Sequence, residues 1–387
     1  MLVGKAGRIA AMLYLDHAAT TVMRAEVRDA MAPFLDDVYG NPSGIHGISR
    51  RVKNAIEEAR EEIAGILGAT RPLEIVFTAG GTEADNLAVA GMVFGPDRRS
   101  KTVTVATEHE AVLETVGFLH RLGHAVDIVG VDALGRVDLD GLVGVIDTDT
   151  AVVSVMAANN ETGVIHPIAA ISEIAHAAGA VMHTDAVQAF ISEEITVAAT
   201  GADLISLAAH KFGGPMGVGL LYVRNGVVLE PVLHGGGQEL GRRSGTLNAA
   251  GIVGLATAMR STVDDRENFR HRVGDARDAF EDVLIEAFPD IRRNAPTDTR
   301  LVQHAHLRIP GVRAETLLIR LDQNGLAAAA GSACQSGALD MSHVLQAMGM
   351  AGAEADECVR FTFGWVNSKA DGLEAARRVI ETVRGLQ

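Results

Sequence analysis

Residues 180–219 read AVMHTDAVQAFISEEITVAATGADLISLAAHKFGGPMGVG, and this stretch decides the fold. It contains two short aliphatic runs, 180–184 and 204–207, each followed by polar residues. Runs of this kind are typical of buried strands. In sheets built from such strands, ligands bind at the carboxyl ends of the strands and at the helix N-termini that follow. Asp185 and Lys211, which come just after the two runs, are therefore candidates for chemistry.

The same pattern continues on both sides of this stretch. Further aliphatic runs predict strands at 74–78, 102–107, 125–131, 151–157 and 217–223. Amphipathic stretches between them predict helices at 82–93, 110–122 and 168–178. Strands rich in Val and Ile that are separated by helices indicate a mostly parallel sheet covered on both faces. We therefore predict an α/β fold with a mostly parallel, seven-stranded sheet.

The chain is long enough for two domains, because it has 387 residues. A charged helical stretch, 264–288, leads into a smaller α+β part. This part is predicted to hold strands near 306–309 and 358–363 and a closing helix at 370–386. We expect a large domain over 14–263 and a small domain over 264–387, with segment 1–20 packed near the small domain.

The composition limits the partners and the compartment. The formal net charge of −15 repels nucleic acid and anionic lipid, so neither is expected as a partner. No apolar run approaches the roughly 18 residues of a membrane helix. The two cysteines, Cys334 and Cys358, exclude a disulfide framework and an all-cysteine zinc site within one chain, and we expect no metal site. The N-terminal stretch lacks a cleavage-like site, so we expect a cytoplasmic protein.

Three groups together suggest a cofactor. In TAGGTEADN (78–86), Gly81 and Thr82 open a predicted helix, where free N–H groups suit a phosphate, although the same residues also make an ordinary helix cap. No P-loop sequence occurs. Lys211 stands beside glycines and, taken alone, is also compatible with a solvated loop. A phosphate-ready helix start, the strand-end Asp185 and the strand-end Lys211 match the needs of pyridoxal 5'-phosphate.

The chain resembles the cysteine desulfurases, which are pyridoxal-phosphate enzymes of the class-V aminotransferase type. The blocks that carry the resemblance lie between residues 14 and 366: LDHAATT, GNPSGIHG, FTAGGTEADNLAV, ATEHEAVLET, AANNETG, HTDAVQAF, AAHKFGGPMGVG, GGGQELGRRSGT, GSACQSG, SHVLQAMG and VRFTFG. The resemblance implies the type I pyridoxal-phosphate transferase fold. It also implies conversion of L-cysteine to L-alanine, with the sulfur left as a persulfide and passed to an acceptor protein, for iron–sulfur cluster assembly or another sulfur-transfer pathway.

The resemblance implies a role for individual residues. Lys211 is the Schiff-base lysine, and Asp185 pairs with the pyridinium nitrogen. His109 stacks on the cofactor ring, although a histidine at a strand end is otherwise read as a helix cap. Arg360 binds the substrate carboxylate, for which a planar guanidinium is well suited.

The remaining implied contacts surround the cofactor. The phosphate is held by Gly81, Thr82 and His210, and the phenolic oxygen accepts a hydrogen bond from Gln188. Asn160 sits beside the cofactor oxygen and the substrate carboxylate. Thr246 reaches a phosphate across a dimer interface, which implies a homodimer.

Cys334 is the implied nucleophile. It stands in GSACQSG (331–337), where no bulky neighbour in the sequence buries it, although these residues alone leave a structural role equally open. The small residues allow the loop to swing between the cofactor and a partner, and the Ser-Ala-Cys wording is that of the family type with a long cysteine loop. Cys358 lies in a predicted strand and is expected in the core.

Four positions depart from the family pattern: Ala208 where a Ser or Thr commonly holds the phosphate, Met216 for a common lysine, Trp365 for a frequent arginine, and His17 for a common asparagine. The missing bond at Ala208 costs on the order of 1–3 kcal/mol, and Ser206 could face the same side of the strand. Two alternatives stay open. One is a selenocysteine lyase or another type I lyase or aminotransferase, and the other is a non-catalytic, partner-binding relative.

Overall fold

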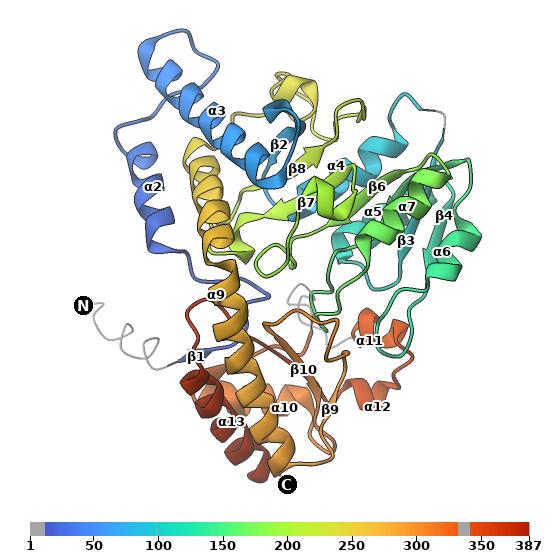
Figure 1. Ribbon diagram of the computed structural model, residues 1–387, viewed down its shortest axis with the longest axis vertical. Helices are drawn as coiled ribbons and strands as arrows, with labels where there is room; N and C mark the ends of the chain where they lie inside the picture. The colour runs from blue at the N-terminus through green and yellow to red at the C-terminus, as the bar shows by residue number, and fades with distance from the viewer. Residues whose placement is uncertain (1–11, 98, 332–340, 387) are drawn as a thin grey trace.

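The structure, a computed structural model, describes residues 12–97, 99–331 and 341–386. Its larger part is built on a seven-stranded sheet of order β2-β8-β7-β6-β5-β3-β4 (Figure 1). The strands are β2 (Ile75–Thr78), β3 (Lys101–Val105), β4 (Val126–Val129), β5 (Thr150–Ser154), β6 (Val181–Asp185), β7 (Leu204–Ala208) and β8 (Gly219–Val223). Only β8 runs antiparallel to its neighbours. The predicted mostly parallel sheet of seven strands is therefore confirmed.

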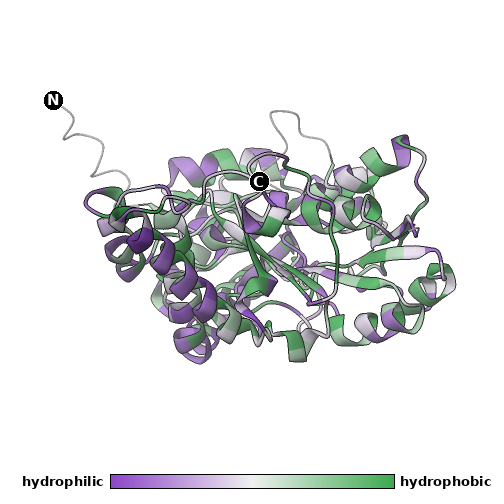
Figure 2. Ribbon diagram, turned by 90° about the horizontal axis from the view of Figure 1, so that it is seen from above, coloured by the Kyte–Doolittle hydropathy of each residue, from purple (hydrophilic) through white to green (hydrophobic). Residues whose placement is uncertain are grey.

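Neighbouring residues of each strand point into different apolar cores, because side chains alternate across a sheet. Val152 and Leu204 belong to the core shared with α4 (Gly81–Val93) and α5 (Glu110–Arg121). The adjacent Val153 and Ile205 belong to the core shared with α3 (Gly47–Leu67), α7 (Ile168–Ala177) and α9 (Ala249–Ala287). Figure 2 shows the hydrophobic residues gathered on the strands and the polar residues on the outer helices. Burial on both faces explains why the strands read as apolar runs.

The long helix α9 passes through both parts of the molecule (Figure 1). It has 39 residues, and the predicted helical stretch 264–288 corresponds to its second half. The expected boundary after residue 263 falls inside this continuous helix, so the division into two domains stays a prediction. In the larger part α9 packs against α3 and α2 (Ala25–Leu35), and in the smaller part against α13 (Lys369–Arg384).

The smaller part contains an antiparallel sheet of order β12-β10-β9. Its strands and helices are β9 (Arg292–Arg293), β10 (His304–Arg308), β12 (Cys358–Thr362), α10 (Ala314–Gln323), α11 (His343–Ala347) and α12 (Gly352–Ala355). The N-terminal strand β1 (Leu13–Tyr14) pairs with β11 (Leu326–Ala327) of this part. Two short helices of the larger part complete the elements, α6 (Leu139–Val145) and α8 (Val197–Thr200). Within the described ranges, no helix is both long and apolar enough to cross a membrane.

Candidate active site

The candidate site is a cavity of about 200 Å³ that residues from both parts of the molecule line. The predicted site residues that line it are Gly81, Thr82, His109, Asn160, Asp185, Gln188, His210, Lys211 and Arg360. Thr246 does not line it. Cys334, the predicted nucleophile, lies outside the described residues. The fold thus brings together side chains that the sequence scatters over almost 300 positions.

Asp185 and Lys211 meet because their strands are neighbours. Asp185 is the last residue of β6, and Lys211 ends the 3-10 turn that follows the parallel strand β7. The carboxylate Oδ1 of Asp185 accepts the Val187 N–H at 2.9 Å. The Nζ of Lys211 donates to the carbonyl oxygens of Ala18 at 2.6 Å and Ala19 at 2.9 Å. The N-terminal segment therefore forms one wall of the cavity and holds the lysine amine there.

Three carboxyl groups are buried at this end of the sheet: Asp185, Asp85 and Glu108. Burial raises the pKa of Asp185, while its interactions with His109, the Val187 N–H and Lys211 lower it. Burial also raises the pKa of Asp85 and of Glu108 well above their usual values, and the charge of Asp185 raises both further. Asp185, which has Lys211 nearby and accepts the Val187 N–H, is therefore the carboxyl best placed to carry the negative charge.

Asp85 is a cavity residue for which no role was predicted. It is 1% exposed, and its Oδ1 has no hydrogen-bond partner among the described residues. The signal was present in the sequence, because Asp85 comes four residues after Gly81 and so lies on the same face of α4.

His109 caps a helix and lines the cavity at the same time. Its Nδ1 accepts the Ala111 N–H at 3.0 Å at the start of α5. In the neutral ring the proton must then sit on Nε2. The helix-cap interpretation and the cofactor-stacking interpretation are therefore compatible in this structure.

The start of α4 offers backbone N–H groups to the cavity. No side chain of the described residues caps this helix, whose first residues Gly81 and Thr82 both line the cavity. A Cβ at Gly81 would lie 3.0 Å from Val187 Cγ2, so glycine keeps the backbone accessible. His210 lines the cavity beside it, and burial, followed by the charge of Lys211, lowers the pKa of His210 to about 4. A neutral imidazole and an uncapped helix start suit a phosphate.

Arg360 occupies another side of the cavity, where it is 1% exposed. Its Nη1 donates to the carbonyl oxygen of Asn160 at 2.9 Å, and its Nη2 lies 2.8 Å from Asp16 Oδ1. The Nε of Arg360 and the Oδ1 of Asn160 have no hydrogen-bond partner within the described ranges. A buried guanidinium that keeps one N–H available fits a carboxylate ligand.

Of the four departures from the family pattern, Ala208 is the one that lines the cavity. Ser206 does not take its place, because the Ser206 hydroxyl lies 3.0 Å from Nε2 of His183 and does not reach the lining. Met216 is 68% exposed and lines a neighbouring groove of about 920 Å³. His17 lies outside the lining and contacts the hydroxyl of Thr21 at 2.6 Å.

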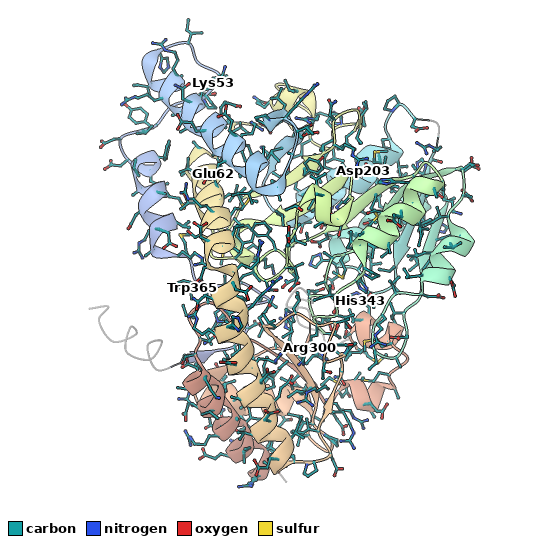
Figure 3. All side chains as sticks on the ribbon, viewed as in Figure 1. Lys53, Glu62, Asp203, Arg300, His343 and Trp365 are labelled. Atoms are coloured by element: carbon teal, nitrogen blue, oxygen red, sulfur yellow. The ribbon has the colours of Figure 1, made fainter. Side chains whose placement is uncertain are left out.

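Trp365 and Cys358 also lie away from the cavity lining. The indole Nε1 of Trp365, labelled in Figure 3, donates to the carbonyl oxygen of Val22 at 3.0 Å, and the Arg24 guanidinium lies 5.1 Å from the ring centroid. Cys358 is fully buried in β12, which confirms the predicted core position. Burial raises the pKa of its thiol to about 12, so it stays protonated.

Thr246 lies in the loop that precedes α9. It lines two other grooves, of about 240 and 50 Å³, together with Leu247. The neighbouring Arg243 binds Glu83 at the start of α4, with its Nε 2.7 Å from Oε1. The loop is thus tied to the helix whose N-terminus faces the cavity, yet within this chain Thr246 contributes to a different surface.

Comparisons with known proteins agree with this architecture. The family model described as aminotransferase class-V matches residues 13–373. A relative from Dictyoglomus turgidum, named cysteine desulfurase IscS, is 42% identical over 376 residues, which cover 96% of this chain and 95% of the relative. The cysteine desulfurase NifS of Azotobacter vinelandii is 39% identical over 350 residues, which cover 90% of this chain and 87% of that protein.

Solved structures give the same result. A NifS-like protein superposes with a TM-score of 0.90 at 33% identity, covering 97% of this chain and 100% of that one. The apo structure of the cysteine desulfurase from Thermococcus onnurineus NA1 superposes with a TM-score of 0.85 at 26% identity, covering 97% of this chain and 96% of that one. The chain therefore belongs to the class-V aminotransferase family and, within it, to the cysteine desulfurases.

Proposed function

We propose that this protein converts L-cysteine to L-alanine and retains the sulfur as a persulfide on Cys334. The observation that carries the proposal is the meeting of Lys211, Asp185 and Arg360 in one cavity. The reaction balances without another reagent, because L-cysteine and one thiol contain the atoms of L-alanine and one persulfide. The family membership supports the same chemistry.

The cavity residues fit pyridoxal 5'-phosphate, the cofactor that the class-V family implies. The uncapped start of α4, with Gly81 and Thr82, and the neutral His210 would hold the phosphate. Asp185 would pair with the pyridine nitrogen, Gln188 would donate to the phenolic oxygen, and Lys211 would hold the aldehyde. When bound, the cofactor supplies an electron-poor ring that takes up the charge left by a departing Cα proton.

Individual side chains of the protein have different roles in the reaction. Arg360 binds the substrate carboxylate through its available Nε–H, and the amide of Asn160 lies beside that position. The Nζ of Lys211 accepts the Cα proton. The nearby carboxylate of Asp185 stabilises positive charge on the groups around it. His109 would shuttle a proton through its Nε2 atom. The Cys334 thiolate attacks the substrate sulfur, since the thiolate is the nucleophilic form.

The proposal includes a homodimer. Leu240, which lines a groove with Thr246, is 71% exposed, and Met216, which lines the groove next to the phosphate end of the cavity, is 68% exposed. A second copy would cover these side chains and bring its own Thr246 to the phosphate end of the first copy. Leu240→Asp should lower both the dimer mass on size exclusion and the cofactor affinity. Asp is chosen because Leu240 has a φ of +58°, which Asp tolerates. An unchanged mass and affinity would count against the dimer.

The proposal also includes an acceptor protein for the sulfur, with an iron–sulfur scaffold as the first partner to test. It places the reaction in the cytoplasm, because the attacking Cys334 thiol must stay reduced.

The central test is incubation of the protein with pyridoxal phosphate and L-cysteine. We expect alanine in the solution and one added sulfur atom on the peptide that contains Cys334, measured by mass spectrometry. Lys211→Ala should abolish both products and the absorbance of the bound cofactor. Cys334→Ser should abolish turnover, whereas an aminotransferase would keep it, and parallel assays with L-selenocysteine would detect a lyase. Finding neither product while the cofactor is bound would refute the proposal.

A further inference from the structure

The carbonyl oxygens that hold Lys211 belong to one tight turn, residues 16–19. The N–H of Ala19 donates to the carbonyl oxygen of Asp16 at 3.1 Å, which closes a β-turn. The carbonyl oxygens of Ala18 and Ala19, the last two residues of the turn, accept hydrogen bonds from the Nζ of Lys211 at 2.6 and 2.9 Å. Both residues also line the cavity. The conformation of this turn therefore sets where the lysine amine is held.

The carbonyl oxygen of Ala18 accepts a second hydrogen bond from a cavity side chain. The Nε2 of Gln188 donates to it at 3.0 Å. Because a glutamine amide carries two N–H groups, this bond is compatible with the proposed contact between Gln188 and the phenolic oxygen of the cofactor. The Ala18 carbonyl thus joins the lysine amine to the residue proposed to lie at the phenolic oxygen.

Two side chains that do not line the cavity fix the turn. Thr362, the last residue of β12, is fully buried, and its Oγ1 accepts the Ala18 N–H at 2.9 Å. The Tyr14 hydroxyl lies 2.9 Å from the carbonyl oxygen of Asp16 and 3.0 Å from that of Thr20. Ala18 itself is 5% exposed, so water cannot readily replace the Thr362 oxygen as the acceptor of its N–H.

We propose that Thr362 and Tyr14 are positioning residues for the transfer of the Cα proton, because they fix the turn whose carbonyl oxygens hold the Lys211 amine. The inference rests on the proposed function, in which Lys211 is the base. When the neutral amine takes the proton from Cα, it becomes an ammonium group with three N–H donors. The electron pair of the broken C–H bond stays with the bound cofactor. Carbonyl oxygens at fixed positions orient the amine and favour its ammonium form.

Four variants separate the effect of the turn from a general loss of stability. Thr362→Val replaces the hydroxyl by a methyl group and leaves the buried Ala18 N–H without its acceptor, whereas Thr362→Ser retains the acceptor oxygen. Tyr14→Phe removes the hydroxyl at the turn and leaves no backbone N–H unpaired. Thr104→Val is the matched control. Thr104 is also fully buried, and its hydroxyl donates to the Ser154 carbonyl at 2.9 Å on β3, away from the turn.

The first measurement is the exchange of the Cα hydrogen of L-alanine for deuterium by the holoenzyme in heavy water, followed by NMR. The amine takes up the Cα proton, exchanges it with the solvent and returns a deuteron, so the reaction needs the base but no sulfur transfer to Cys334. We expect the maximal rate to fall about 10- to 100-fold in Thr362→Val and about three- to tenfold in Tyr14→Phe. Thr362→Ser and Thr104→Val should change it less than about threefold. Cofactor absorbance and the half-saturating L-alanine concentration should match the wild type in all four variants.

The second measurement uses the full chain after removal of the cofactor. Acetic anhydride modifies Lys211 at a single pH, and mass spectrometry compares its extent with that at Lys369, an exposed lysine at the start of α13. An ammonium group has no lone pair with which to react, so hydrogen bonds that favour it slow acetylation. Lys211 should react about three to ten times faster in Thr362→Val than in the wild type, and at the wild-type rate in Thr362→Ser and Thr104→Val.

The outcomes distinguish the inference from the proposed function. If the wild type with bound cofactor neither exchanges L-alanine nor forms persulfide from L-cysteine, the proposed function fails. If the wild type exchanges L-alanine but Thr362→Val exchanges it and is acetylated at wild-type rates, or Thr104→Val is slowed as much, the positioning role is overturned. Should Thr362→Val not fold, Tyr14→Phe decides the matter: exchange at the wild-type rate overturns the role, and slower exchange with unchanged binding supports it.

Discussion

Arg360 and Asp16 form an ion pair with 2.8 Å between Nη2 and Oδ1, although 344 positions separate them in the sequence. Their side chains are 2% and 18% exposed, so the pair is largely shielded from water. It joins β12 to the N-terminal segment, whose next residues hold Lys211. The two ends of the described chain thus build the substrate side of the cavity together. One N–H on each Nη atom is thus engaged, and the Nε–H has no partner among the described residues, so it is available to a ligand.

Replacing Arg360 should weaken substrate binding more than cofactor binding. Arg360→Gln is expected to raise the KM for L-cysteine at least about tenfold, because a charge-assisted bond to the carboxylate is lost. Asp16→Asn keeps an acceptor for Nη2 and should raise KM by about two- to fivefold. Steady-state assays give both values, and the absorbance of the bound cofactor is the control. An Arg360→Gln variant with the wild-type KM would contradict the assignment.

Ala208→Ser should tighten cofactor binding. Ala208 ends β7 and lies 3.6 Å from the position of a Cβ on Gly81, so a hydroxyl there would reach the phosphate end of the cavity. One added hydrogen bond to a phosphate should lower the dissociation constant of pyridoxal phosphate about tenfold in equilibrium titrations. Ser206→Ala is the matched control, because the Ser206 hydroxyl contacts His183, and its cofactor affinity should not change. Equal affinities of wild type and Ala208→Ser would place the phosphate elsewhere.

His109→Asn and His109→Ala separate the two roles of the ring. Asn retains a side-chain acceptor for the Ala111 N–H and therefore the helix cap, whereas Ala loses it. We expect His109→Ala to lose about 1 kcal/mol more unfolding free energy than His109→Asn in urea denaturation. Both variants should lose about 100-fold or more in kcat if the ring acts in proton transfer. Retained turnover in His109→Asn would show that the cap alone matters.

His166 should make the stability depend on pH. Burial lowers the pKa of His166 from 6.5 to about 4 in the folded protein. Between these two values the unfolded chain binds a proton that the folded chain does not, so the unfolding free energy falls as the pH is lowered through this window. At pH values well above 6.5 this group contributes no pH dependence.

His166→Leu removes this proton and two ring nitrogens that have no partner among the described residues. The variant should lose less stability between pH 7 and pH 5, with a slope smaller by at most about 1.4 kcal/mol per pH unit. Urea denaturation at several pH values measures the slope. The wild type measured at the same pH values is the reference. Identical slopes for His166→Leu and wild type would disprove the prediction.

The strands were predictable where apolar runs are short and bounded by turn residues. The run 204–207 corresponds to β7, and 180–184 to β6, which both extend one residue further. The predicted strand 151–157 ends three residues beyond β5, because residues 155–157 are buried although they are not part of the strand. An irregular buried segment and a strand have the same apolar composition, so the pattern cannot separate them.

The first half of α9 was not predicted. Between 249 and 259 almost every residue of the helix is buried, and α9 packs there against α2 and α3. A helix without a polar face shows no 3.6-residue period, whereas its solvent-exposed second half does. The sequence pattern therefore predicts a helix over 264–288 but not over the preceding residues 249–263.

The sequence by itself determined the residue types and the order of the motifs: strand-end Asp185 and Lys211, the helix start at Gly81, and the blocks that identify the family. It could do so because each depends on neighbours within a few positions. Only the tertiary structure decided which of these groups meet. It placed Asp85 in the cavity and Thr246 outside it, paired Arg360 with Asp16, and joined Thr362 to Ala18. Such contacts depend on how distant elements pack, which no local pattern encodes.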